Sequence, residues 1–179
     1  MDFYGMFDFA QGDDDTYKYT SAEFSNLIAG LTGDGVSYNF GNRFALDSTS
    51  GLSITVGSGA VFIQGRYAYN LSTETLSASA VASGTTRKDM LVAELDIANR
   101  IIELKIIEGT ASDFPTPTSN QVPIYEITVS SSGVSSAISA TNDIRSFIYT
   151  SSLYPSTQII YSRTTPAYVE GAIWLKPLE

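Results

Sequence analysis

Apolar and polar residues alternate along much of the chain between residues 52 and 145. In segment 52–56 every second residue is apolar, and a period of two places these side chains on one face of a β-strand. Comparable alternation, or a short apolar run bounded by turn residues, recurs further along. The strands predicted in this way cover residues 52–56, 59–65, 87–96, 100–106, 125–129 and 134–138.

Three connections between these strands have clear signals. Ala98-Asn99 separates two alternating runs and predicts a hairpin, because asparagine tolerates the left-handed backbone conformation that such turns need. Gly57 to Gly59 predicts a tight turn. Three prolines with threonine and serine predict an extended loop over residues 110–123.

One helix is predicted near residues 21–31. Thr20 and Glu23 match the capping box that starts a helix, and Gly30 and Gly33 supply stop signals. The helix carries one apolar stripe at helical spacing, formed by Phe24, Leu27, Ile28 and Leu31. A helix of about 10 residues is unstable alone, so we expect this stripe to dock on other structure.

These elements predict a mainly β fold. We expect an antiparallel β-sandwich-like domain over residues 1–149, with one short N-terminal helix, followed by an extended C-terminal segment. Residues 150–179 contain three prolines and few charges, which is typical of a linker or arm. The last two residues, Leu178-Glu179, resemble a cloning remnant, so the arm is expected to lead to a C-terminal part missing from this chain.

Composition narrows the classes of function. The net charge of −9 disfavours nucleic acid as a partner, because an acidic surface repels phosphates. The 179 residues include no histidine and no cysteine, which excludes histidine-dependent triads and metal sites built on these ligands. No stretch approaches the ~20 apolar residues that span a bilayer, so membrane insertion is not expected. We expect no enzyme activity and no cofactor.

Carboxylates are the remaining candidates for chemistry. Glu94, Asp96 and Glu103 are predicted to share one face of the central hairpin, where two carboxyl groups at about 5–10 Å would suit a glycosidase. The favoured interpretation is the solvated face of an amphipathic sheet. The acidic run Asp13-Asp14-Asp15 is either a Ca²⁺ site or a solvated turn, and the solvated turn is favoured because the spacing of an EF-hand is absent.

The many tyrosines suggest contact with a partner. Tyrosine is common in strands, so core filling is one explanation, and stacking on sugars or a subunit interface is the other. Aromatic residues are enriched at interfaces, which favours that role for those near the C-terminus. The candidate interface residues are Tyr149, Tyr154, Tyr161, Tyr168 and Trp174.

An ordered set of segments resembles a family of phage proteins. It includes Gly35-Val36, Phe44, and the runs at 52–56, 59–67, 87–96, 100–104, 109–110 and 143–145. The set, together with the capped helix before it, is similar to tail and baseplate proteins in phages and prophages of Gram-positive bacteria. These include N-terminal modules of upper baseplate proteins and receptor-binding fibre proteins.

The resemblance implies a virion structural protein that is made in the bacterial cytoplasm and resides in the phage tail. It implies a homotrimer that docks onto other tail or baseplate proteins and connects them to a part that reaches the host surface, where a glycan is an expected partner. It carries over no catalytic residues. It marks Arg87, Asp89, Asp143 and Arg145 as recurring polar positions, which we expect to form ion pairs that fix strand ends.

Two alternative functions stay open at this point. One is a carbohydrate-binding module that recognises cell-wall or surface glycan through exposed tyrosines. The other is a glycan hydrolase that uses Glu94, Asp96 or Glu103.

Overall fold

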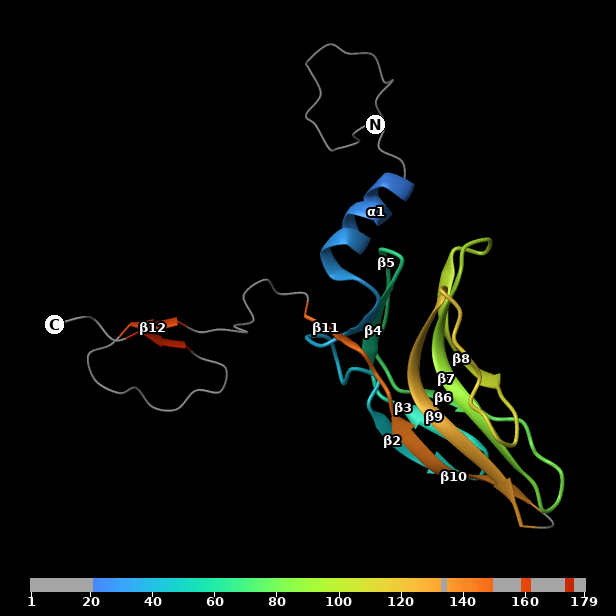
Figure 1. The fold of residues 1–179 in the computed structure, drawn as a ribbon. Coiled ribbons are helices and arrows are strands. Elements are labelled where there is room, and N and C mark those ends of the chain that lie inside the picture. The colour runs from blue at the N-terminus through green and yellow to red at the C-terminus, as the bar shows by residue number, and fades with distance from the viewer. Residues whose placement is uncertain (1–20, 133–134, 150–158, 162–172, 176–179) are drawn as a thin grey trace.

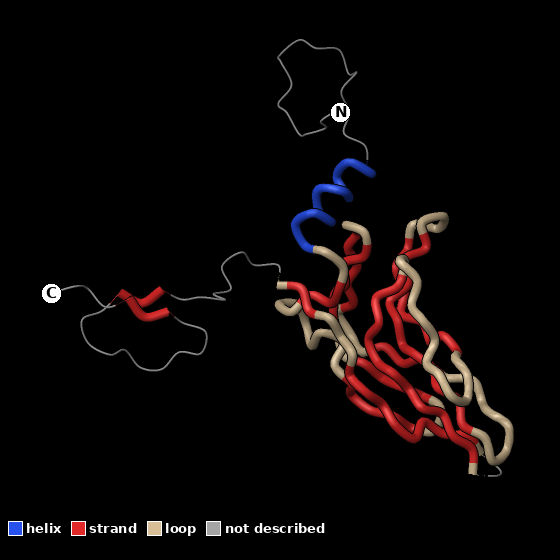
Figure 2. The backbone as a smooth tube through the Cα atoms, in the orientation of Figure 1, coloured by secondary structure: helices blue, strands red, loops and turns tan. Residues whose placement is uncertain are grey.

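The computed structural model describes residues 21–132, 135–149, 159–161 and 173–175 (Figures 1 and 2). Helix α1 spans Ser21–Thr32. The strands are β1 Gly35–Ser37, β2 Leu46–Ser50, β3 Ser53–Val56, β4 Gly59–Ile63, β5 Arg66–Asn70, β6 Glu74–Ser77, β7 Thr86–Asp96, β8 Ile101–Glu108, β9 Gln121–Ser131, β10 Ser136–Asp143, β11 Phe147–Ile148, β12 Ile159–Tyr161 and β13 Ile173–Leu175. The predicted mainly β fold with one helix is confirmed for the described residues.

Strands β1 to β11 form one long sheet and two shorter sheets that face it. The long sheet has the order β10-β9-β7-β8 and is antiparallel throughout. The shorter sheets have the orders β11-β1-β4-β5 and β2-β3-β6. Figure 1 shows the long strands β7 and β9 running the length of the domain, with the shorter strands beside them. This is a sandwich-like arrangement.

The core lies between these layers, as the alternating pattern predicts. Ile54 and Val56 of β3 are buried while Ser53 and Thr55 are only half-buried. Apolar side chains from all three sheets meet in a single cluster, and its members include Val36, Ile54, Val56, Val61, Ile63, Leu91, Ala93, Leu95, Ile124, Ile127 and Val129. Burial of such side chains contributes about 1.5–3 kcal/mol each relative to exposure.

Residues 57 and 58 form a corner between two sheets. The strands on either side, β3 and β4, lie in different sheets and do not pair, so the predicted turn at Gly57–Gly59 does not close a hairpin. The amide of Phe44 donates to the carbonyl of Ser58 at 3.1 Å, and a Cβ on Gly59 would lie 2.6 Å from the Phe44 ring. Glycine is required here because the buried ring of Phe44 packs directly on the backbone.

The central hairpin is present as predicted, with one difference in its turn. Strands β7 and β8 pair from Asp89 opposite Glu108 to Asp96 opposite Ile101. Arg100, not Asn99, has the left-handed conformation, with φ of 59°. The Asp96 carboxylate accepts hydrogen bonds from the amide and the side chain of Asn99, at 2.9 and 2.7 Å. Asn99 is held by these two bonds, and the left-handed residue of the turn is the next one, Arg100.

Pro123 lies in β9, although the sequence places it in the preceding loop. The register between β7 and β9 shifts here, since Leu91 pairs with Tyr125 and Val92 pairs with Pro123. On the other side, the pairing of β10 ends at Tyr125. A proline lacks the amide hydrogen that a sheet uses, so it is tolerated at such a bulge, where one neighbouring strand has already ended.

The helix ends where the sequence predicts, but its stripe is not docked. Gly33 has φ of 71° and its amide donates to the Ala29 carbonyl at 3.0 Å, which terminates the helix. Gly30 lies inside the helix instead of ending it, and Thr20 of the predicted capping box lies outside the described residues. The helix touches the β4–β5 turn through Ser25, while Phe24, Leu27 and Leu31 of its apolar stripe are exposed.

Two parallel pairs complete the fold. The short strand β1 pairs with β11, so that Val36 lies opposite Phe147 and Ser37 opposite Ile148. Strands β12 and β13 pair with each other. They lie within the segment 150–179, which the sequence predicts to be extended, and the rest of that segment lies outside the described residues.

Gly65 provides a test of how α1 is attached. It has φ of 70°, and a Cβ there would lie 1.7 Å from the Ser25 carbonyl oxygen. We expect Gly65→Ala to destabilise the domain by more than about 2 kcal/mol, because left-handed strain of about 1–2 kcal/mol adds to a backbone clash. The control is Gly84→Ala, since Gly84 has φ of 72° but no neighbour within 4 Å of an added Cβ. Equal losses for both variants in chemical unfolding would contradict the contact.

Candidate interaction surfaces

The hairpin carboxylates are held in ordinary polar contacts. Glu94 lies directly opposite Glu103 on β8, as the sequence predicts for a shared face. Glu94 accepts hydrogen bonds from Lys105 at 2.8 Å and from Gln121, and the bond from Lys105 is the main reason its pKa is lowered. The pKa of Asp96 is lowered by the Asn99 bonds. Because a general acid needs a raised pKa, neither group is prepared to protonate a leaving group.

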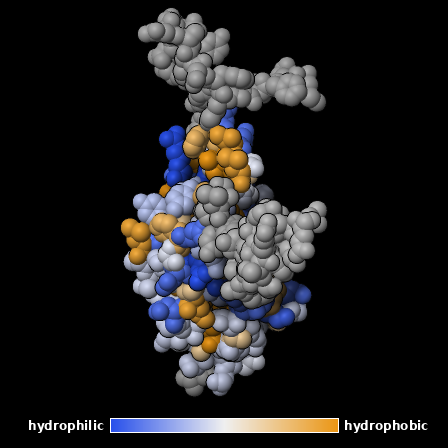
Figure 3. Space-filling view, turned by 90° about the vertical axis from the view of Figure 1, so that its left-hand side faces the viewer, coloured by the Kyte–Doolittle hydropathy of each residue, from blue (hydrophilic) through white to orange (hydrophobic). Residues whose placement is uncertain are grey.

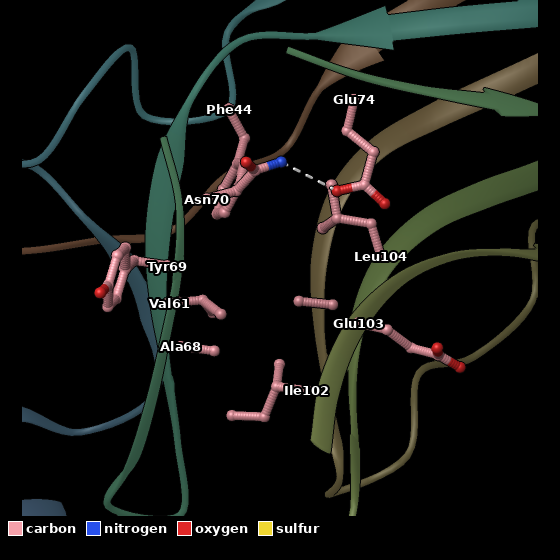
Figure 4. A pocket seen from close by; sticks show the side chains of 10 residues that line it. Phe44, Val61, Ala68, Tyr69, Asn70, Glu74, Ile102, Glu103 and Leu104 are labelled. Atoms are coloured by element: carbon pink, nitrogen blue, oxygen red, sulfur yellow. Dashed lines mark hydrogen bonds between the residues drawn. The ribbon is translucent and has the colours of Figure 1, made fainter. Parts of the chain in front are cut away.

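A cavity of about 250 Å³ lies beside this hairpin, between β8 and the β4–β5 strands. Figure 4 shows its apolar wall, formed by Val61, Ala68, Ile102 and Leu104. Its two carboxylates do not converge on a common point. Glu74 accepts a hydrogen bond from Asn70 at 3.1 Å, and Glu103 points away from the cavity in Figure 4.

Arg87 and Asp89 form an ion pair on β7. The Asp89 side chain is fully buried, and its two carboxylate oxygens accept hydrogen bonds from the Arg87 guanidinium at 2.7 Å. The Arg87 guanidinium also lies 3.4 Å from the carboxylate of Glu108, which is directly opposite Asp89 on β8. One guanidinium therefore compensates two neighbouring carboxylates at the end of the sandwich.

Arg145 and Asp143 form the second pair, at the end of β10. The Arg145 Nε donates to Asp143 at 2.8 Å, and this bond is the main cause of the lowered pKa of Asp143. Arg145 also donates to the carbonyl of Arg43 at 2.7 Å and lies over the rings of Tyr125 and Phe147. It therefore joins the last strands of the domain to the loop that carries Phe44.

The predicted interface residues are only partly described. Tyr149 is about half exposed and its ring stacks on Tyr38 with centroids 4.7 Å apart. Tyr161 lies in β12 and Trp174 in β13. The structure describes the backbone of these two strands but not the burial of their side chains. Tyr154 and Tyr168 lie outside the described residues.

A second aromatic group lies around the β4–β5 hairpin. Its tyrosines, Tyr67 and Tyr69, are among the tyrosines expected from the sequence to stack on sugars or form an interface, and its two phenylalanines are not. The rings of Phe40, Tyr69, Tyr67 and Phe62 follow one another with centroid distances of 5.5, 5.8 and 4.8 Å. Tyr67 and Tyr69 are 46% and 59% exposed. They occupy alternate positions in β5, so the period of two in Arg66–Asn70 was the signal that could have placed them on one face.

The apolar stripe of α1 is the largest departure from what the sequence predicts. Phe24, Leu27 and Leu31 are 54%, 42% and 73% exposed, although they were expected to dock, and only Ile28 of the predicted stripe is half-buried. Figure 3 shows apolar side chains gathered on the helix. Their spacing of three and then four residues matches the a and d positions of a helix bundle. No helix among the described residues packs against this stripe, since α1 is the only helix in that part of the chain.

The described residues contain no group of three acids or other metal ligands, and Asp13–Asp15 lie outside them. Within the same described ranges, no helix has the length and apolar character to cross a membrane.

Removing one partner of the buried Asp89 pair should strongly destabilise the domain. We expect Asp89→Ala to cost about 3–5 kcal/mol in chemical unfolding, because it leaves the Arg87 charge without its buried partner. The matched control is Glu94→Ala, which breaks the more exposed pair with Lys105 and should cost at most about 1 kcal/mol. Similar losses in the two variants would show that burial does not distinguish the pairs.

Comparison with known proteins adds no further constraint on function. No protein-family model matches the chain, and no curated protein sequence matches it.

Proposed function

We propose that the chain is a structural protein of a phage or prophage tail or baseplate, located in the virion. In this proposal it assembles as a homotrimer, docks onto other tail or baseplate proteins, and connects them through the arm at residues 150–179 to a host-recognition part. The segments that resemble the phage family support it, because three of them contain the strands β3 and β4 and most of β7, which contribute buried side chains to the core of the sandwich.

The exposed stripe of α1 is the observation that carries the assembly role. A helix of 12 residues is marginal alone, and this one touches its own domain mainly around Gly65. Its exposed apolar side chains lie at bundle spacing, and its described residues include a single charge, at Glu23. Such a face fits equivalent helices from two further copies.

We expect the full chain to be a trimer, and the double variant Leu27→Glu/Leu31→Glu to be monomeric. Each buried leucine contributes about 2 kcal/mol, and glutamates at these positions would repel one another around the axis. Light scattering after size exclusion should show an approximately threefold drop in mass. The control is Leu71→Glu, since Leu71 is 77% exposed outside the helix and should leave the trimer intact. A monomeric starting chain, or a variant of unchanged mass, would contradict the proposal.

A second candidate function is favoured by the rings on β5. Tyr67 and Tyr69 are exposed, 5.8 Å apart and inclined by 32°, and each lines a cavity, which is a geometry that suits stacking on sugar rings. In this case the chain is a carbohydrate-binding module for cell-wall or surface glycan.

This candidate predicts saturable binding of cell-wall polysaccharide in calorimetry. Tyr67→Ala and Tyr69→Ala should each weaken binding by about tenfold, the loss of one stacking contact. Tyr149→Ala is the matched control, because Tyr149 is equally exposed but lies after β11. Absence of binding, or an equal loss in the control, would count against a glycan site on β5.

A further inference from the structure

A cleft of about 530 Å³ separates the ends of two hairpins. One wall is β5 with the start of α1, and the other is the tip of the β7–β8 hairpin. Figure 1 shows these two ends diverging beside the helix. The residues that matter for recognition are Ser25, Arg66, Tyr67, Ile97, Arg100 and Ile101.

Two arginines face this cleft without a carboxylate partner in the described part of the chain. Arg66 donates to the backbone carbonyl of Gln64 at 3.1 Å, and no ion pair is formed by Arg66 or Arg100 among the described residues. Of the other described cations, Arg87, Lys105 and Arg145 are each paired with a carboxylate, while Arg43 and Lys88 are not and lie outside the cleft. In a chain with a net charge of −9, two such guanidinium groups in one cleft indicate an acidic ligand.

The rest of the cleft indicates an extended and apolar ligand. Ile97, Ile101 and Tyr67 are each about half exposed on its walls. The strands beside it are the outermost of their sheets, since β5 ends one sheet and β8 ends another. An outermost strand offers unpaired backbone groups to an added strand, and alternate side chains of that strand then fill apolar sites.

We propose that this cleft binds residues 3–15 of the same chain. Residues 1–16 hold five aspartates, no lysine or arginine, and the aromatic residues Phe3, Tyr4, Phe7 and Phe9. Acidic and aromatic residues are the two kinds that the arginines and the apolar walls would recognise. This inference is independent of the proposed tail function.

The connection to α1 makes the intramolecular contact feasible. The helix begins at Ser21, and Ser25 in its second turn lines the cleft. Asp15 precedes Ser21 by six residues, which reach up to about 20 Å when extended. Phe7 precedes it by 14 residues, which reach up to about 45 Å. The aspartates can therefore meet Arg66 and Arg100 while the aromatic residues continue along the cleft.

Disulfide trapping tests the proposal on the full chain, which has no native cysteine. Under mild oxidation, Phe7→Cys combined with Ile101→Cys should form an intramolecular disulfide, detected by mobility on a non-reducing gel and by peptide mapping. The control combines Phe7→Cys with Leu71→Cys, because Leu71 is exposed but does not line the cleft. Equal trapping in both variants would overturn the proposal, and a predominantly intermolecular disulfide would show that the segment binds another copy instead.

Charge provides the second readout. When Arg66→Glu and Arg100→Glu are added to the Phe7→Cys/Ile101→Cys variant, its rate of disulfide formation should fall roughly fivefold. This is the loss expected for two exposed ion pairs. Replacing Asp13, Asp14 and Asp15 by lysine in that background should restore it. Raising the salt concentration should also lower the rate of disulfide formation in the double-cysteine variant that keeps both arginines, because salt screens exposed charges. A trapping rate that depends neither on these charges nor on salt would overturn the role of the arginines.

Discussion

The domain depends on the apolar contact between the long sheet and the two short sheets. The chain has no cysteine, so no disulfide limits the unfolded state, and the packed side chains must offset the conformational entropy of folding. Side chains from β3, β4, β7 and β9 form most of this contact. The corner at residues 57 and 58 makes it possible, because it allows successive strands to enter different sheets over one core.

Charge plays a supporting part at the ends of this core. Arg87 and Arg145 each bind an aspartate two residues away along the chain, and each then bonds a further segment. Arg87 donates to the carbonyl of Ser79, and Arg145 to that of Arg43. Each pair therefore lies near a strand end and also bonds a neighbouring loop, whose own apolar residues, Phe44 in one case and Ala78 in the other, belong to the core.

Periodicity predicted the parts of the fold that face the core on one side. The β7–β8 hairpin, the strand at 53–56 and the end of α1 followed from alternation, helical spacing and a glycine. Strand β2 could not be predicted in this way, because all five of its residues are exposed. The sheet membership of β3 and β4 and the bulge at Pro123 depend on contacts between distant segments, which local sequence does not encode.

The surfaces were harder to predict than the core for a related reason. An apolar stripe on a helix predicts burial but not the partner, so Leu27 and Leu31 were expected to dock within the domain and are exposed. Arg66 and Arg100 are 34 positions apart, and only the facing of two hairpin ends brings them to one cleft. The ion pairs of Arg87 and Arg145 were expected only from the family resemblance, and in each pair the two partners lie two residues apart.

The parallel pairing of β1 with β11 has a mechanical consequence. The chain enters the sheet at the start of β1 and leaves it at the end of β11, and these neighbouring strands point the same way. Tension applied between the start of β1 and the end of β11 would slide one strand along the other. The hydrogen bonds from Val36 to Ser146 and from Tyr38 to Ile148 would therefore bear the load together instead of breaking one after another. The domain is thus built to resist being pulled apart along its own chain.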